Sequence, residues 1–127
     1  MKGDFVIKNK KTVFIDKRAK IGKNVIIYEN NRIEGYCEIA DNVTIFPNCF
    51  IYDSIIGKGC KIYTSVIEKS VLGACVSVGP FSNVKGAKID ELTKIGSFCE
   101  IKNVEVEKSS VIKSFSSLCE DKKGKKR

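Results

Sequence analysis

Aliphatic residues recur along most of this chain at intervals of six, with occasional intervals of five. An α-helix has 3.6 residues per turn and a strand alternates every two residues, so neither element by itself produces this period. A step of six is instead the mark of a repeat architecture in which one short strand and one bend form each unit. The series comprises Ile15, Ile21, Ile27, Ile33, Ile39, Ile45, Ile51, Ile56, Ile62, Ile67, Leu72, Val78, Val84, Ile89, Ile95, Ile101, Val106, Ile112 and Leu118.

A second period shows that three units make one coil. Every third unit opens with an aliphatic residue followed by a small or acidic one: Ile21-Gly22, Ile39-Ala40, Ile56-Gly57, Leu72-Gly73, Ile89-Asp90 and Val106-Glu107. In the same column Asn24, Asn42 and Gly59 fall at equivalent corners, and Asn and Gly tolerate a positive φ. The sequence therefore predicts an all-β, parallel β-helix of about six triangular coils in a single domain. A β-sandwich would instead show period two, with turns every 8 to 12 residues.

The same pattern predicts the limits of the repeats. We expect an N-terminal lead-in and cap over residues 1–14, hexapeptide repeats over 15–119, and a basic, disordered tail over 120–127. The net charge of +8 is concentrated at the two ends, which favours protection of the open edges of the β-helix. A basic tail could also bind nucleic acid, but no recognition motif accompanies it, so nucleic-acid binding is not expected.

Composition excludes several kinds of chemistry. The 127 residues include no His, so imidazole is not available as a general base or as a metal ligand. Six Cys are present, but their spacing contains no C-x-x-C pair, and no metal site is predicted. Cys37, Cys49, Cys60 and Cys99 fall at the small inward position of their units, which predicts buried thiols.

The N-terminal residues are charged rather than apolar, and no apolar run is long enough for a membrane helix. These features predict a protein of the cytoplasm that keeps its thiols reduced and makes no membrane contact.

One block resembles a known family. Val78-Gly79-Pro80-Phe81, followed by Lys94-Ile95-Gly96-Ser97-Phe98-Cys99-Glu100-Ile101-Lys102-Asn103, is similar to the C-terminal acetyltransferase domain of the bifunctional UDP-N-acetylglucosamine pyrophosphorylase/glucosamine-1-phosphate acetyltransferase. Asp53-Ser54-Ile55-Ile56-Gly57 resembles runs in the same domain and in related sugar-nucleotide pyrophosphorylases. The resemblance covers most of residues 3–118 and implies a left-handed coil, a homotrimer and no nucleotidyltransferase domain in this chain.

The resemblance also implies which site residues are kept and which are lost. Lys85 and Lys102 align with the Arg and Lys that hold the sugar phosphate in the family, so both are candidate ligands for a sugar phosphate. Ser114 aligns with the general-base His and Ser117 with a nearby Tyr, and a serine hydroxyl cannot replace imidazole near neutral pH. We therefore expect no catalytic residue at this position. Acetyl-CoA is a cofactor by resemblance only, because we expect the coils that bind it in the family to be truncated here.

Two hypotheses of function follow. The first is a degenerate sugar-phosphate acyltransferase-like domain that binds a sugar phosphate or similar anion, with weak activity or none on its own and no required cofactor. The second is a non-catalytic structural or regulatory homotrimer that partners a separate nucleotidyltransferase. Its expected interface is one aromatic column, with one ring per coil: Tyr28, Phe46, Tyr63, Phe81, Phe98 and Phe115.

Overall fold

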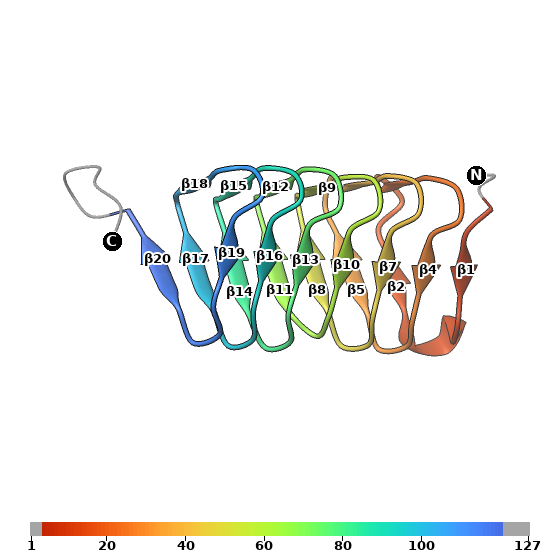
Figure 1. Ribbon diagram of the computed structural model, residues 1–127. Coiled ribbons are helices and arrows are strands. Elements are labelled where there is room, and N and C mark those ends of the chain that lie inside the picture. The colour runs from red at the N-terminus through yellow and green to blue at the C-terminus, as the bar shows by residue number, and fades with distance from the viewer. Residues whose placement is uncertain (1–3, 121–127) are drawn as a thin grey trace.

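The computed structural model describes residues 4–120 as a stack of short parallel strands wound into three sheets (Figure 1). Sheet A contains β1 (Val6–Ile7), β4 (Ile26–Ile27), β7 (Thr44–Ile45), β10 (Lys61–Ile62), β13 (Ser77–Val78), β16 (Lys94–Ile95) and β19 (Val111–Ile112). Sheet B contains β2 (Phe14–Ile15), β5 (Arg32–Glu34), β8 (Phe50–Tyr52), β11 (Val66–Glu68), β14 (Asn83–Lys85), β17 (Glu100–Lys102) and β20 (Ser117–Cys119). Sheet C contains β3 (Lys20–Ile21), β6 (Glu38–Ile39), β9 (Ile55–Ile56), β12 (Val71–Leu72), β15 (Lys88–Ile89) and β18 (Glu105–Val106).

Each strand pairs with the strand three places along the chain, so three strands complete one turn of the coil. This connectivity confirms the predicted fold class, an all-β left-handed parallel β-helix. The coil has about seven turns rather than about six, because β1 already pairs with β4 through Val6↔Ile26 and Ile7↔Ile27. A 3₁₀ turn, η1 (Lys10–Thr12), links β1 to β2. Of the predicted tail over 120–127, only Glu120 lies within the described residues.

The core is the column of repeat aliphatics that the six-residue period predicts. Every one of these side chains from Ile27 to Ile112 is buried, and they stack on their register partners in neighbouring coils. Cys37, Cys49, Cys60 and Cys99 are also buried, as predicted, whereas Cys75 is exposed. A strand of two or three residues therefore presents one side chain to the core and its neighbours to the surface.

The corners need backbone that most residues avoid. Asn24, Asn42 and Gly59 adopt positive φ angles of 57°, 64° and 75°, as the sequence predicts. Buried hydroxyls then satisfy the corner amides. The Ser65 hydroxyl accepts a hydrogen bond from the Ser82 amide at 3.2 Å, and the Ser82 hydroxyl accepts one from the Cys99 amide at 3.1 Å. These bonds tie successive coils together where the strands end.

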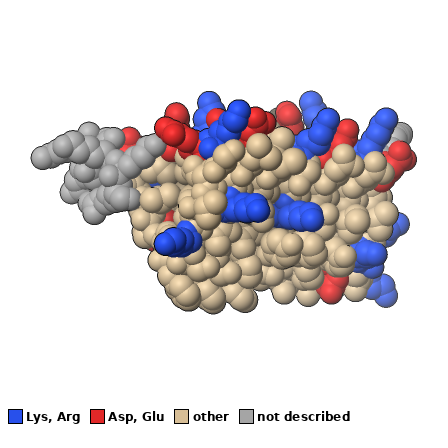
Figure 2. All heavy atoms as spheres, in the orientation of Figure 1, with Lys and Arg blue, Asp and Glu red and all other residues tan. Residues whose placement is uncertain are grey.

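Across residues 4–120 the structure contains no helix of the length and apolar character needed to cross a membrane. The molecule presents differently charged faces. Figure 2 shows sheet A toward the viewer as a mostly uncharged surface with a few Lys or Arg side chains, while charges of both signs follow its upper edge. That upper edge is where β9, β12, β15 and β18 of sheet C lie in Figure 1.

Candidate functional site

The two lysines predicted to bind a phosphate lie next to each other. Lys85 ends β14 and Lys102 ends β17, and the two residues are register partners in sheet B. Neighbouring strands are about 4.8 Å apart, so the two side chains leave the sheet side by side. Lys85 is exposed and Lys102 is half-buried. The structure therefore brings together two cations that are one full coil apart in the sequence.

Two further residues complete a four-residue group on the outer face of sheet B. Asn83 and Glu100 lie two residues before Lys85 and Lys102 on the same strands and are themselves register partners. Alternate residues of a strand share a face, so Asn83, Lys85, Glu100 and Lys102 form one surface, which we name the lysine patch.

Charges within and beside the patch are partly balanced. The Lys102 ammonium nitrogen lies 3.0 Å from the Glu100 Oε2 atom. Its hydrogen bond to Glu100, together with the negative charge of that carboxylate, raises the pKa of Lys102. On the other side, Glu68 of β11 is the register partner of Lys85. Like charges in directly paired positions repel, so the two lysines favour an anion beside them.

Asn83 contributes an unsatisfied group. Its side-chain oxygen Oδ1 is buried and has no hydrogen-bond partner among the described residues. Buried polar atoms are nearly always paired in folded proteins, and this oxygen can accept a hydrogen bond. The sequence reasoning did not identify Asn83 or Glu100 as site residues. Their i, i+2 spacing from the two lysines on neighbouring strands is the signal that could have found them.

Ser114, which the resemblance aligns with a general-base His, lies away from the lysine patch on the same chain. It follows β19 and precedes β20, at the corner where sheet A turns into sheet B. Lys102 lies at the other end of the sheet B strands. The Ser114 hydroxyl accepts a hydrogen bond from the Ser97 amide at 2.9 Å. Its observed role is therefore to bind the backbone of the preceding coil.

Two aromatic stacks run along the corner between sheets A and B. Tyr28, Phe46 and Tyr63 stack with ring centroids 5.3 and 4.3 Å apart. Phe81, Phe98 and Phe115 stack in the following coils at 5.2 Å in each step. In the second stack Phe81 is 61% exposed, Phe98 52% and Phe115 77%. It leaves a narrow apolar ridge on the surface, in the column that the sequence assigns to a homotrimer interface.

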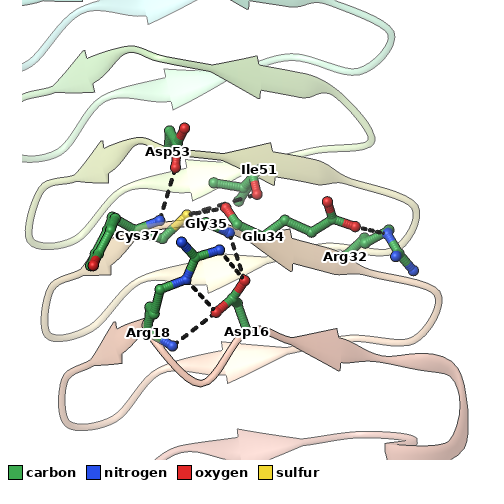
Figure 3. Close-up of polar contacts among 9 residues, drawn as sticks. Asp16, Arg18, Arg32, Glu34, Gly35, Cys37, Ile51 and Asp53 are labelled. Carbon is green, nitrogen blue, oxygen red and sulfur yellow. Dashed lines mark hydrogen bonds and ion pairs between the residues drawn. The ribbon is translucent and has the colours of Figure 1, made fainter.

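A network at the corner between sheets B and C was not predicted (Figure 3). Asp16 accepts hydrogen bonds from the Arg18 guanidinium at 3.0 and 2.9 Å and from the Gly35 amide at 3.0 Å. The Arg18 side chain, with the Arg18 and Gly35 amides, holds the pKa of Asp16 well below its usual range. In the next coil Asp53 accepts from the Tyr36 amide at 2.9 Å.

The contacts of this corner network stabilise the fold of the corner. Gly35 has a φ of 80°, and a Cβ there would lie 2.0 Å from the Asp53 Oδ1 atom. Arg18 also lies over the Tyr36 ring, with its guanidinium carbon 4.9 Å from the ring centroid. The carboxylates are thus committed to backbone amides and to Arg18. Among the described residues, no group of three or more Cys, Asp or Glu side chains is arranged to hold a metal ion.

Comparison with known proteins identifies the family. A family model described as the GMPPB C-terminal domain matches residues 1–95. The bifunctional protein GlmU of Geobacillus sp. (strain WCH70) is 38% identical over 84 residues, which cover 65% of this chain and 18% of that protein. GlmU of Carboxydothermus hydrogenoformans is 37% identical over 86 residues, covering 67% of this chain and 19% of that protein. The chain thus spans less than a fifth of the length of these curated relatives.

A solved structure is also similar in part. A mutant of perosamine N-acetyltransferase from Caulobacter crescentus, in complex with CoA and GDP-perosamine, has a TM-score of 0.39 and 17% sequence identity, covering 91% of this chain and 50% of that chain. The assignment of the family rests on the sequence matches. They agree with the acyltransferase-like domain that the resemblance implies, and the family model matches most of the chain. The chain therefore belongs to the GMPPB C-terminal domain family.

Proposed function

We propose that this chain is a degenerate sugar-phosphate acyltransferase-like domain that binds the phosphate of a sugar phosphate, or a similar anion, at the lysine patch. The observation that carries the proposal is the register pairing of Lys85 with Lys102. The backbones of neighbouring strands are about 4.8 Å apart, so both ammonium groups can reach one bound anion. Lys102 already contacts Glu100 at 3.0 Å, so the anion would share Lys102 with that carboxylate and gain a new contact to Lys85.

The patch suits a phosphate on a sugar better than a bare inorganic ion. Lysine binds phosphate as a point charge and lacks the bidentate fork of arginine, so the two lysines alone give little orientation. Orientation would come from Glu100 beside them, whose carboxylate accepts hydrogen bonds from hydroxyl or amino groups. A ligand with a phosphate at one end and such donors at the other fits the mixture of charges in the patch.

Turnover is not part of the proposal. The chain contains no His, and the Ser114 hydroxyl is occupied by the Ser97 amide. A serine hydroxyl titrates far above neutral pH and cannot accept the proton of an attacking amine as imidazole does. No cofactor is required for the proposed binding.

Calorimetric titration of the full chain with glucosamine 1-phosphate tests the proposal, with acetyl-CoA titrated in parallel. We expect saturable binding of the sugar phosphate that weakens at least tenfold in Lys85→Ala and in Lys102→Ala. Lys94→Ala is the matched control, because Lys94 is also an exposed strand lysine but its register partners are Ser77 and Val111. The absence of binding, or an equal loss in the control, would overturn the proposal.

A second function is favoured by one observation, the exposed ridge of Phe81, Phe98 and Phe115. This chain would then be a non-catalytic homotrimer, structural or regulatory, that contacts a separate nucleotidyltransferase. Burying three exposed phenyl rings in each protomer would remove substantial apolar surface from water. Light scattering measures the mass of the assembly directly. A mass of three chains that falls in Phe98→Asp supports the homotrimer, and a mass of one or two chains contradicts it.

A further inference from the structure

The outward row of sheet C has an unusual order of charges. The first residue of each sheet C strand points outward, and register pairing places these six residues in a straight row across the coils. The burial pattern of these strands is exposed at this position and buried or half-buried at the next. Reading from the N-terminal coil, the row is Lys20, Glu38, Ile55, Val71, Lys88 and Glu105.

This row is complementary to itself when it is reversed. Read backwards it runs acid, base, apolar, apolar, acid, base, so every position meets its opposite charge or another apolar side chain. Lys20 would face the Glu105 position of a second copy, and Glu38 would face the Lys88 position. At the centre Ile55 would face the Val71 position. These two central side chains are 43% and 39% exposed, which is high for large aliphatic residues in the middle of a sheet.

We propose that sheet C binds sheet C of a second copy of this chain, face to face, with the two β-helices antiparallel. The two-fold axis would lie in the interface, along the strands and between β9 and β12. In such an interface residue i contacts residue j and j contacts i, which is the relation that the reversed row satisfies. A parallel pair is less complementary. It would set Lys88 against the Asp90 position, but it would also set Glu105 against the Glu107 position and leave Lys20 and Glu38 facing small uncharged residues.

The second outward column of sheet C fits the same arrangement. It consists of the residues that follow the buried aliphatics, namely Gly22, Ala40, Gly57, Gly73, Asp90 and Glu107. The small residues leave a hollow of about 300 Å³ over β3, β6 and β9. Reversal places Asp90 opposite Ala40 and Glu107 opposite Gly22, so longer side chains meet this hollow. At the centre Gly57 meets Gly73, which lets the two sheets approach closely.

The size of the face sets the expected strength of the pair. Six strands about 4.8 Å apart and about five residues wide, at about 3.3 Å each, cover about 500 Å². The pair would bury about 1,000 Å² in total, at the lower limit for a specific interface. We therefore expect a weak dimer in which the charges fix the orientation and the apolar centre supplies most of the attraction.

The aromatic ridge and sheet C do not overlap. The ridge lies at the corner between sheets A and B, and sheet C is the face opposite that corner in the triangular coil. Pairing through sheet C therefore needs neither the ridge nor the lysine patch, so a failure of anion binding and a failure of pairing can be told apart.

Sedimentation equilibrium of the full chain at about 100 µM, a concentration suited to micromolar affinity, tests the pair. We expect a mass near twice 14.1 kDa for the unaltered chain. Lys88→Glu and Glu38→Lys should each raise the dissociation constant at least tenfold, because each sets like charges against each other twice in a homodimer. Mixing the two variants should restore the dimer, since both contacts in the mixed pair are again opposite in sign.

Two more variants complete the test. Ile55→Lys should also give a single chain, because it places two cations at the centre of the interface. Val111→Lys is the control, since Val111 is 74% exposed on sheet A. A single-chain mass for the unaltered protein would overturn the inference. A three-chain mass that none of these sheet C variants changes would also overturn it. So would a single-chain mass for the mixture of Lys88→Glu and Glu38→Lys, provided that circular dichroism shows both variants folded.

Discussion

The Ser114 hydroxyl oxygen lies 2.9 Å from the Ser97 amide nitrogen and accepts its hydrogen bond. The two residues are 17 apart in sequence, one full coil. Gly96 makes this approach possible, because a Cβ at Gly96 would lie 2.6 Å from the Ser114 amide nitrogen and 2.7 Å from its hydroxyl oxygen. Ser114, the residue that the resemblance aligns with a general base, therefore makes a contact between coils.

The first prediction concerns Gly96. Gly96→Ala places a methyl group against the backbone of the next coil, which cannot move without disturbing the β19–β20 corner. We expect the free energy of unfolding to fall by about 1–3 kcal/mol, the usual cost of overpacking. Thermal unfolding followed by circular dichroism measures the change. Lys94→Ala, two residues away and exposed, should stay within about 0.5 kcal/mol of the unaltered chain; an unchanged Gly96→Ala protein would contradict the close approach.

Asn31 gives a second prediction. Its side chain is only 2% exposed. Its Oδ1 atom accepts from the Cys49 amide at 2.7 Å and its Nδ2 atom donates to the Tyr28 carbonyl at 2.9 Å. Asn31→Ala leaves the buried Cys49 amide and the partly buried Tyr28 carbonyl without these partners, so we expect the free energy of unfolding to fall by about 1–3 kcal/mol. Urea unfolding should show a lower midpoint, with Lys61→Ala on the surface as the comparison. Equal midpoints for the two variants would show that the contacts contribute nothing.

The third prediction follows from the depressed pKa of Asp16. A carboxyl whose pKa is lower in the folded than in the unfolded chain stabilises the fold above the unfolded value, and that contribution disappears as the pH falls through the folded value. Asp16→Asn should therefore be less stable than the unaltered chain at pH 7, and the difference should shrink as the pH drops below about 4. Urea unfolding of both proteins at pH 7 and at pH 3 measures the difference in the free energy of unfolding at each pH. A difference that does not depend on pH would mean that the charge of Asp16 is not involved.

The cysteines give a fourth prediction. Burial raises the pKa of Cys49 and of Cys60 to about 11, so both thiols remain protonated near neutral pH. Cys75 is exposed. Brief treatment of the folded protein with iodoacetamide at pH 8 should label Cys75 and leave Cys49 and Cys60 unmodified, as read by mass spectrometry of peptides. The same treatment in urea provides the control and should label all three. Rapid labelling of Cys60 in the folded protein would contradict the burial.

Much of this fold can be predicted from the sequence because the repeat is a local rule. One aliphatic residue every five or six positions, with Asn or Gly where the chain turns, specifies strand, corner and inward face without knowledge of distant contacts. The repeat also places Lys85 and Lys102 in one column. The first coil was missed because Val6 and Ile7 lie before the regular spacing begins, and only their pairing with β4 places them in sheet A.

The sequence by itself determined the period, the buried aliphatic column and the absence of imidazole. The tertiary structure decided what stacks across coils, because those partners are separated by a full turn of chain. Stacking sets Lys85 beside Lys102 and commits Ser114 to the Ser97 amide. It also lines up one row on the face of sheet C: Lys20, Glu38, Ile55, Val71, Lys88 and Glu105. No short stretch of sequence contains that row, since its members become neighbours only when the coil closes.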